Sequence, residues 1–279
     1  MILAIDIGNT TTSFGVFEKG KLKSQFSIST QSGRTADEIT LQLKALAKTR
    51  HLHLSKAKQI LICSVVPRMT SVLVQALRSL DAIPIRIIGQ DITVPLKNRY
   101  TYPEQVGQDR LVGAYAAWKL YGNAGPRRRS AGRSPERSAG GGESRETGRD
   151  VIVADFGTAI TIDVVTKRGE YLGGVIAPGL DISLDALATR TALLPKVELK
   201  EPPELLGRDT ANSIRSGVLH GCVALCDGLI TALKRRYAPQ AAVVATGGAG
   251  ALIAKHAKTI QHLRPHLVLE GLSQLSASR

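Results

Sequence analysis

The first apolar segment of the chain ends in an acidic residue, a glycine and a run of hydroxyl side chains. Residues 2–8 read Ile-Leu-Ala-Ile-Asp-Ile-Gly. A glycine lets the backbone approach a phosphate, and turn amides with neighbouring Asn and Thr side chains can donate hydrogen bonds to its oxygens. Asp6, at the end of the strand, can hold a hydrated Mg²⁺ that bridges phosphates. We therefore predict a phosphate-binding loop, and the alternative is an ordinary hairpin turn. The loop residues are Asp6, Ile7, Gly8, Asn9, Thr10, Thr11, Thr12 and Ser13.

The same pattern returns in the second half of the chain. Residues 151–157 read Val-Ile-Val-Ala-Asp-Phe-Gly, and at a constant offset of 149 positions Asp6 falls on Asp155 and Gly8 on Gly157. Two such turns that face each other across a cleft would clamp phosphates. The alternative is a chance Asp-x-Gly match between two unrelated halves.

A third motif, Thr-Gly-Gly-Ala-Gly, follows an expected strand and opens an expected helix. Its closely spaced glycines, Gly247 and Gly248, would let the backbone lie against a planar base or a ribose. The motif is not the G-x-G-x-x-G of dinucleotide-binding folds, so we do not predict a dinucleotide. The alternative is a glycine turn at the start of a helix.

A fourth motif, Gly107-Gln108-Asp109-Arg110, precedes an apolar helix expected at Leu111–Leu120. A carboxylate beside the cleft could accept a proton from an alcohol, and a guanidinium could bind an acid or a phosphate through two hydrogen bonds. The alternative is a helix cap at Asp109 with a surface salt bridge at Arg110.

The elements around these motifs are expected to form two copies of one arrangement. Each copy begins with three antiparallel strands and continues as helix, strand, helix and strand, which predicts an α/β fold with mixed sheets flanked by helices. The first copy comprises strands within 2–28, a helix after a capping box at Thr35, a strand at Gln59–Val66, a helix at Thr70–Leu80 and a strand at Ile83–Ile88. The second comprises strands within 151–176, helices near 179–189 and 208–237, a strand at Ala241–Ala245, a helix at 249–256 and a strand at Leu267–Leu269.

Composition restricts the class of protein. The chain has 279 residues, of which 43% are hydrophobic and 22% charged, so it can bury a globular core. We expect no signal peptide and no membrane span, and three cysteines fit a reducing cytoplasm. The net charge of +14 suggests nucleic-acid binding, but aromatic residues make up only 4%, which leaves few stacking platforms. A positive field would also attract an anionic nucleotide or acid.

Residues 124–150 differ from the rest of the chain. They contain no Val, Ile, Leu, Phe, Tyr or Trp and are rich in Gly, Ser, Arg and Pro. Such a segment buries too little apolar area to offset the entropy of ordering it. We predict a flexible insertion between residues 1–123 and 151–279, and a basic arm that binds nucleic acid is the alternative.

Together the four motifs resemble type III pantothenate kinase, a family in the superfamily of acetate kinase, sugar kinases, Hsp70 and actin. The resemblance covers nearly the whole chain except 124–150. The Asp-Ile-Gly-Asn-Thr and Gly-Gln-Asp-Arg motifs together are specific to the family, whereas each Asp-x-Gly alone marks the superfamily. The resemblance implies two ribonuclease H-like (actin-like ATPase) domains, each a mixed five-stranded sheet flanked by helices, with the active site in the cleft between them.

The activity implied by this resemblance is ATP-dependent phosphorylation of pantothenate to 4′-phosphopantothenate, the first step of coenzyme A synthesis. Asp6–Ser13 would bind the phosphates of Mg-ATP, Thr158 would bind ATP, and Asp155 would bind an activating K⁺ or NH₄⁺. Gly107–Arg110 would form the substrate loop, with Asp109 as the proton acceptor.

The resemblance also implies that Tyr100 and Thr210 contact pantothenate in a cytoplasmic homodimer whose substrate pocket borders the partner subunit. Two other functions remain open on the same fold. One is an ATP-binding conformational switch, and the other is a regulatory factor that acts on transcription through the basic insertion.

Overall fold

The computed structural model describes the chain except for residues 32, 53–55, 81, 123–147 and 278–279. The expected insertion at 124–150 therefore lies outside the described residues, apart from its last three positions. The described residues that border the gap at 123–147 are adjacent, because the backbone N–H of Arg149 donates to the carbonyl oxygen of Gly122 at 3.0 Å. A segment whose ends meet can vary in length without displacing the halves that it joins.

The first half of the chain forms a five-stranded mixed sheet with two helices on one face. Its elements are β1 (Ile2–Ile7), β2 (Thr11–Glu18), β3 (Lys21–Ser29), α1 (Ala36–Thr49), β4 (Gln59–Ser64), α2 (Pro67–Leu80) and β5 (Ile85–Ile87). The strand order is β3-β2-β1-β4-β5, with β1 antiparallel to β2 and parallel to β4. The capping box at Thr35 is confirmed, since Thr35 and Glu38 exchange hydrogen bonds at the start of α1.

The second half repeats this architecture. Its elements are β7 (Val151–Phe156), β8 (Ala159–Val165), β9 (Glu170–Pro178), α4 (Leu180–Arg190), α5 (Thr210–Tyr237), β10 (Ala242–Thr246), α6 (Gly250–His256) and β11 (His262–Leu263). The strand order β9-β8-β7-β10-β11 matches that of the first sheet, so the duplication is confirmed. A sixth strand, β6 (Lys97–Asn98), comes from the first half and pairs with β9, so the second sheet has one strand more than expected.

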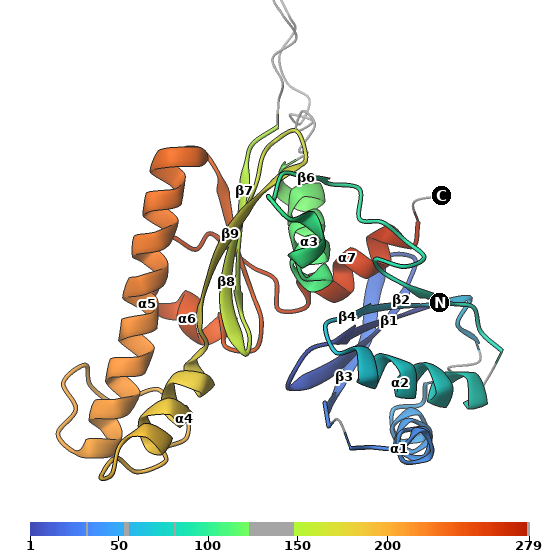
Figure 1. The fold of residues 1–279 in the computed structure, drawn as a ribbon, viewed down its shortest axis with the longest axis horizontal. Coiled ribbons are helices and arrows are strands. Elements are labelled where there is room, and N and C mark those ends of the chain that lie inside the picture. Colours follow the sequence, from blue (N-terminus) through green and yellow to red (C-terminus); the bar gives the residue numbers. More distant parts are fainter. Residues whose placement is uncertain (32, 53–55, 81, 123–147, 278–279) are drawn as a thin grey trace, which may run out of the picture.

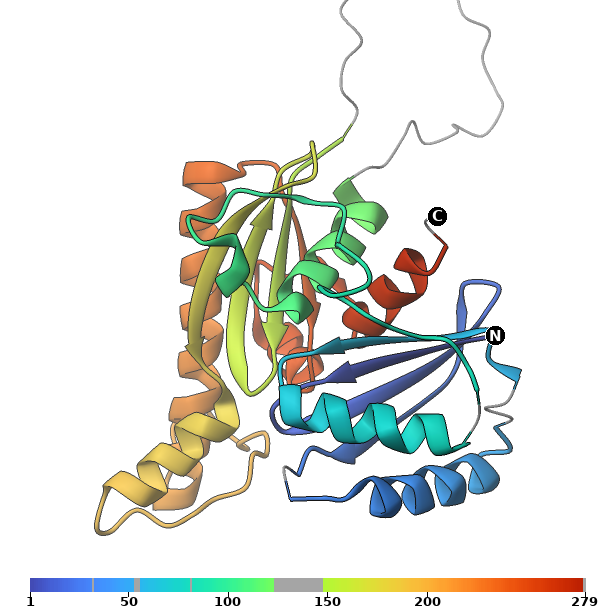
Figure 2. The same cartoon turned by 45° about the vertical axis from the view of Figure 1, so that its right-hand side comes forward.

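Two helices lie between the sheets, α3 (Gln108–Ala117) and α7 (Leu267–Leu275), as Figures 1 and 2 show. A short 3₁₀ turn at Pro103–Gln105 leads into α3, and a π-helical turn at Trp118–Gly122 follows it. The core around α3 and α7 contains side chains from both sheets. Helices α1 and α2 cover the outer face of the first sheet, and α4, α5 and α6 cover that of the second.

The strand expected at Leu267–Leu269 is wrong, because these residues begin α7. Three consecutive apolar residues fit either a buried strand or a buried helix. Packing decides in favour of the helix, which lies against α3 and β1. A Cβ on Gly271 would lie 2.7 Å from Cγ1 and the carbonyl oxygen of Val112, so the glycine allows α7 to cross α3 closely.

Helix α5 is the one helix in the described part of the chain that is long and apolar enough to cross a membrane by length and composition. It packs against the second sheet through Ile214, Leu219, Cys226 and Ile230. This packing accounts for its apolar composition as that of a helix with one face in the core.

Candidate active site

The β1–β2 turn exposes part of the predicted phosphate loop. Asn9, Thr10 and Thr11 are exposed at the turn. Ile7 and Thr12 are cross-strand partners that are both fully buried, and the Thr12 hydroxyl hydrogen-bonds that of Thr30 at 2.8 Å. The alternation of side chains along the strands therefore withholds the Thr12 hydroxyl from any phosphate.

The corresponding β7–β8 turn meets the β1–β2 turn directly. The hydroxyls of Thr10 and Thr158, one from each half, hydrogen-bond at 2.9 Å. The expectation that the two duplicated turns face each other is confirmed. Gly8 and Gly157 close their turns through backbone N–H donors to the carbonyl oxygens of Thr11 and Ala159.

Three carboxyl groups gather beside these turns: Asp6 at the end of β1, Asp155 at the end of β7 and Asp109 in the first turn of α3. Burial, with the charges of Asp109 and Asp155, raises the pKa of Asp6 to about 8. Burial, with the charges of Asp109 and Asp163, raises the pKa of Asp155 to about 7. A carboxylate loses hydration on burial and is repelled by its like-charged neighbours, so this cluster attracts cations.

The glycine turn between β10 and α6 lies against the β7–β8 turn. Gly247 has φ +87°, and a Cβ there would lie 2.4 Å from Oδ1 of Asp155. Gly248 is exposed, with open space where a Cβ would be. The backbone N–H of Ala249 donates to the carbonyl oxygen of Phe156 at 3.1 Å, which joins the two turns. Gly247 is thus required for the close approach of the two turns, and Gly248 leaves open space beside its backbone.

Asp109 lies in the first turn of α3, where the backbone approaches its side chain closely. Gly107 is the N-cap residue, and a Cβ on it would lie 2.5 Å from Oδ1 of Asp109. That oxygen accepts a hydrogen bond from the backbone N–H of Arg110 at 2.8 Å. Burial raises the pKa of Asp109, although this hydrogen bond and the charge of Arg110 oppose the rise. Gln108 packs against Gly89, whose φ is +84°.

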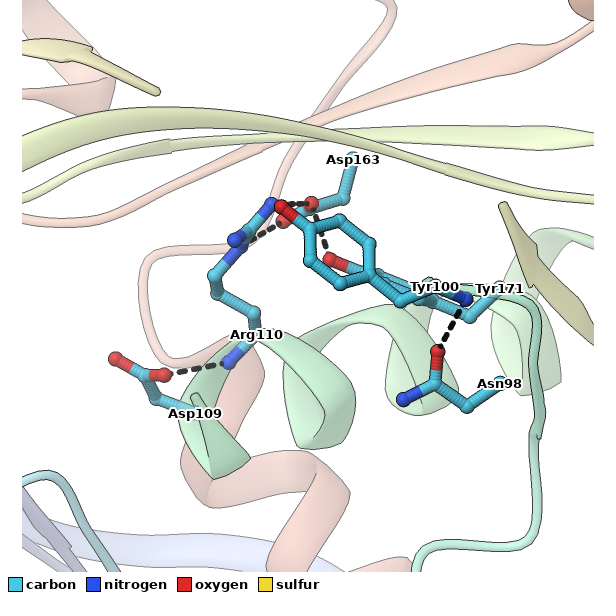
Figure 3. A network of polar contacts seen from close by, with 6 residues as sticks. All are labelled: Asn98, Tyr100, Asp109, Arg110, Asp163 and Tyr171. Atoms are coloured by element: carbon cyan, nitrogen blue, oxygen red, sulfur yellow. Dashed lines mark hydrogen bonds and ion pairs between the residues drawn. The ribbon is translucent and has the colours of Figure 1, made fainter. Parts of the chain in front are cut away.

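Arg110 is largely buried, so the alternative of a surface salt bridge at this position is wrong. Its side chain is only 10% exposed and binds Asp163 of β8 through Nη2 at 2.6 Å and Nε at 3.3 Å. Asp163 also accepts a hydrogen bond from the Tyr171 hydroxyl at 2.7 Å. Burial acts to lower the pKa of Arg110, but Asp163 outweighs it and raises that pKa above its ordinary value. Figure 3 shows the carboxylate of Asp109 pointing away from this pair.

Tyr100 lies beside the same network (Figure 3). Its backbone N–H donates to Oδ1 of Asn98 at 2.9 Å, and its ring lies on Gly173 of β9, where a Cβ would approach it to 3.1 Å. Gly173 has φ +111° and adjoins a register shift between β8 and β9. An irregularity in the second sheet therefore makes room for a ring from the first half of the chain.

Thr210 is the one predicted substrate contact that this chain does not bring to the others. It is the exposed first residue of α5, which covers the outer face of the second sheet, whereas α3 lies on the opposite face. Figures 1 and 2 both show the N-terminal end of α5 next to α4 and away from α3.

Asp163 and Tyr171 were missed from the sequence. The duplication gave no signal, because the offset of 149 places Asp163 on Phe14. The available signal was an acidic residue between Ile162 and Val164 in an otherwise apolar strand, which indicates a buried charge with a partner.

The carboxyl cluster fits a cation that is completed by other ligands. No group of three or more His, Cys, Asp or Glu within the described ranges forms a metal cage. Mg²⁺ in nucleotide sites usually keeps waters and phosphate oxygens and takes only one or two carboxylates. Asp6 and Asp155 suit such a site because other carboxylates crowd them, and no cationic side chain is among the described groups that shift their pKa values.

Comparison with known proteins identifies relatives over nearly the whole chain. The family model for type III pantothenate kinase matches residues 2–126 and 139–232. A type III pantothenate kinase of Moorella thermoacetica is 37% identical over 98% of this chain and 97% of its own length. The enzyme of that name from Anaeromyxobacter dehalogenans is also 37% identical, over 98% of this chain and 97% of its own length.

Solved structures with low sequence identity share the fold. A Campylobacter jejuni protein assigned to the Baf family of transcriptional activators has a TM-score of 0.53 at 17% identity and covers 98% of this chain and 95% of its own. A Sinorhizobium meliloti protein assigned as a 2-dehydro-3-deoxygalactonokinase has a TM-score of 0.55 at 13% identity and covers 99% of this chain and 98% of its own. At these identities the likeness concerns the fold alone.

Proposed function

The chain belongs to the type III pantothenate kinase family, and from this membership we propose how its two halves perform the reaction. The protein is a phosphotransferase with an alcohol acceptor, which phosphorylates pantothenate to 4′-phosphopantothenate in coenzyme A biosynthesis. ATP is the phosphoryl donor. The observation that carries the assignment of the site is the meeting of the two duplicated turns beside Asp6, Asp109 and Asp155.

ATP phosphates occupy the junction of the two turns in this proposal. The backbone amide of Asn9 and the hydroxyls of Thr10 and Thr158 supply donors from both sides, and the Thr10–Thr158 hydrogen bond gives way to the phosphates. Gly247 and Gly248 present backbone to the rest of the nucleotide. Charge on the transferred group is spread over several oxygens, so donors from two sides stabilise it better than one.

Asp109 accepts the proton of the pantothenate hydroxyl. Its carboxylate aligns that hydroxyl and takes the proton as the new oxygen–phosphorus bond forms. Burial raises the pKa of Asp109, which moves a carboxylate towards the range where a base is effective at neutral pH. Arg110, Gln108 and Tyr100 line the substrate side of the same helix start, and the guanidinium binds the pantothenate carboxylate.

Asp6 and Asp155 hold the cations. Asp6 contributes to the binding of Mg-ATP, and Asp155 binds a monovalent cation, K⁺ or NH₄⁺. These cations supply charge neutralisation at the phosphates. The raised pKa values of both acids support the assignment, because a bound cation would relieve the repulsion that raises them.

A homodimer is supported by the outer face of α5. Gly217, Gly221 and Gly228 are exposed there, and a Cβ on any of them meets nothing within 4 Å. Each such glycine costs a helix about 0.5–1 kcal/mol relative to alanine, which close approach of a second helix would offset. Leu205 and Leu206 are 71% and 72% exposed beside this helix. A second copy packed here would cover these groups, and Thr210 would face the partner subunit.

The chemistry also indicates where the enzyme acts. The three cysteines are free and buried, and the substrates are cytoplasmic metabolites, so we infer a cytoplasmic enzyme.

Pantothenate-dependent release of ADP in a coupled assay tests this function. We expect turnover that requires ATP, Mg²⁺ and K⁺ or NH₄⁺, and Asp109→Asn should lower kcat by about 10²–10⁴-fold with ATP binding little changed. Absence of pantothenate-dependent turnover in the wild type would overturn the function. Near-normal turnover of Asp109→Asn would overturn only the role of that residue.

A further inference from the structure

Asp163 is the least exposed charged residue in the described part of the chain. Its side chain is 2% exposed, and it faces α3 from the middle of β8. A buried carboxylate without partners is costly, and Asp163 takes its partners from Arg110 and Tyr171. A Cβ on Gly174, its cross-strand neighbour, would lie 2.4 Å from Oδ1 of Asp163, so the sheet is also shaped around this carboxylate.

The ion pair joins residues 53 positions apart and decides where the Arg110 guanidinium lies. Arg110 follows Asp109 directly, and a guanidinium forms strong, often bidentate hydrogen bonds with a carboxylate within its reach. Asp163 occupies its Nε and Nη2 edge, so the side chain runs towards β8 while the Asp109 carboxylate points the other way (Figure 3). Among the described residues no hydrogen bond involves Nη1, which remains for a ligand.

We infer that Asp163 is a positioning residue that keeps the Arg110 guanidinium off the catalytic carboxylate of Asp109. This inference rests on the proposed function, in which Asp109 is the base. By holding two nitrogens of Arg110, Asp163 leaves Asp109 free for the substrate hydroxyl and leaves Nη1 of Arg110 free for the substrate carboxylate. A salt bridge with only a structural role would affect the stability of the fold, and its loss would not make Arg110 bind the carboxylate of Asp109.

The test uses Asp163→Asn, Arg110→Gln, the double variant and Tyr171→Phe in the full-length enzyme. Asp163→Asn releases Arg110, which then binds Asp109, so kcat should fall by about 10–100-fold with the KM for ATP unchanged. Arg110→Gln should raise the KM for pantothenate and retain most of kcat. The double variant should match Arg110→Gln in kcat and therefore be at least fivefold faster than Asp163→Asn, because no guanidinium is left to capture the base.

Tyr171→Phe is the matched control. It removes a hydrogen bond from Asp163 but leaves the ion pair, so it should lower Tm while kcat stays within about threefold of the wild type. A double variant that is much slower than Arg110→Gln overturns the inference, and this comparison holds even if Asp163→Asn alone does not fold. A kcat of Asp163→Asn equal to that of the wild type overturns it as well. A wild type without pantothenate-dependent turnover would instead refute the proposed function.

Discussion

Replacing Asp155 with Asn should stabilise the protein at alkaline pH in the absence of ligands, although it removes a proposed cation ligand. Burial and two neighbouring carboxylates raise the pKa of Asp155 from 3.8 to about 7. Between these two values the folded protein binds a proton that the unfolded chain has released. Stability therefore falls as pH rises through this window, and the full loss is present above pH 7.

The size of the effect follows from the shift. A shift of about 3 pKa units corresponds to at most about 4 kcal/mol, since one unit is 1.36 kcal/mol. Part of this is lost because the amide of Asn must itself be buried, so we expect a gain of about 1–3 kcal/mol at pH 8.5. For a chain of this size that raises Tm by roughly 3–8 °C. Loss of one charge also relieves Asp6, whose pKa is about 8.

Thermal unfolding at pH 5 and pH 8.5, with tetramethylammonium as the only cation, measures this effect. The gain should be largest at pH 8.5 and smaller by roughly 2–3 kcal/mol at pH 5, because the folded protein takes up its proton between these pH values, whereas the part of the loss that arises between pH 3.8 and pH 5 remains. Asp227→Asn is the matched control. Burial acts to raise the pKa of Asp227, but hydrogen bonds from Thr259 and from the backbone of Lys258 outweigh it and lower that pKa.

Asp227→Asn should therefore destabilise the protein by about 1–3 kcal/mol at pH 8.5, the opposite sign to Asp155→Asn. The stability that Asp227 contributes is present above its unfolded pKa and is lost as pH falls through its folded pKa. The reasoning is refuted if the Tm of Asp155→Asn at pH 8.5 is equal to or lower than that of the wild type. It is also refuted if the increase in Tm at pH 5 is as large as the increase at pH 8.5, because repulsion among the three carboxylates would then not destabilise the folded protein.

Three further outcomes are expected. Gly247→Ala should lower the free energy of unfolding by about 2–5 kcal/mol and abolish most activity, because an alanine is strained at φ +87° and its Cβ would lie 2.4 Å from Oδ1 of Asp155. In the same melting experiment, Gly248→Ala should change the free energy of unfolding by less than about 0.5 kcal/mol. Excising residues 124–147 with a short glycine bridge should leave kcat and Tm close to those of the wild type, and a folded but inactive product would contradict this. Gly221→Glu should convert the dimer into monomers in sedimentation, and an unchanged sedimentation coefficient would refute the proposed α5 interface.

Local patterns were enough to predict much of the fold. The repeated strand ending in Asp-x-Gly, the capping box at Thr35 and the alternation of strands and helices predicted two equivalent halves, and the matching strand orders confirm them. These signals are local because a turn or a cap involves residues a few positions apart. The same turns located Asp6 and Asp155, which the structure brings together with Asp109.

Contacts between distant segments decided the rest. Leu267–Leu269 became a helix because α3 and β1 were there to pack against, and the two residues of β6 became a strand only by pairing with β9. The partner of Arg110 is 53 residues away, and no local spacing encodes such a pair. The sequence by itself determined which residues stand at turns and helix starts, since that depends on neighbours in the chain. Tertiary structure alone decided which charges meet, since that depends on how two sheets and the helices between them pack.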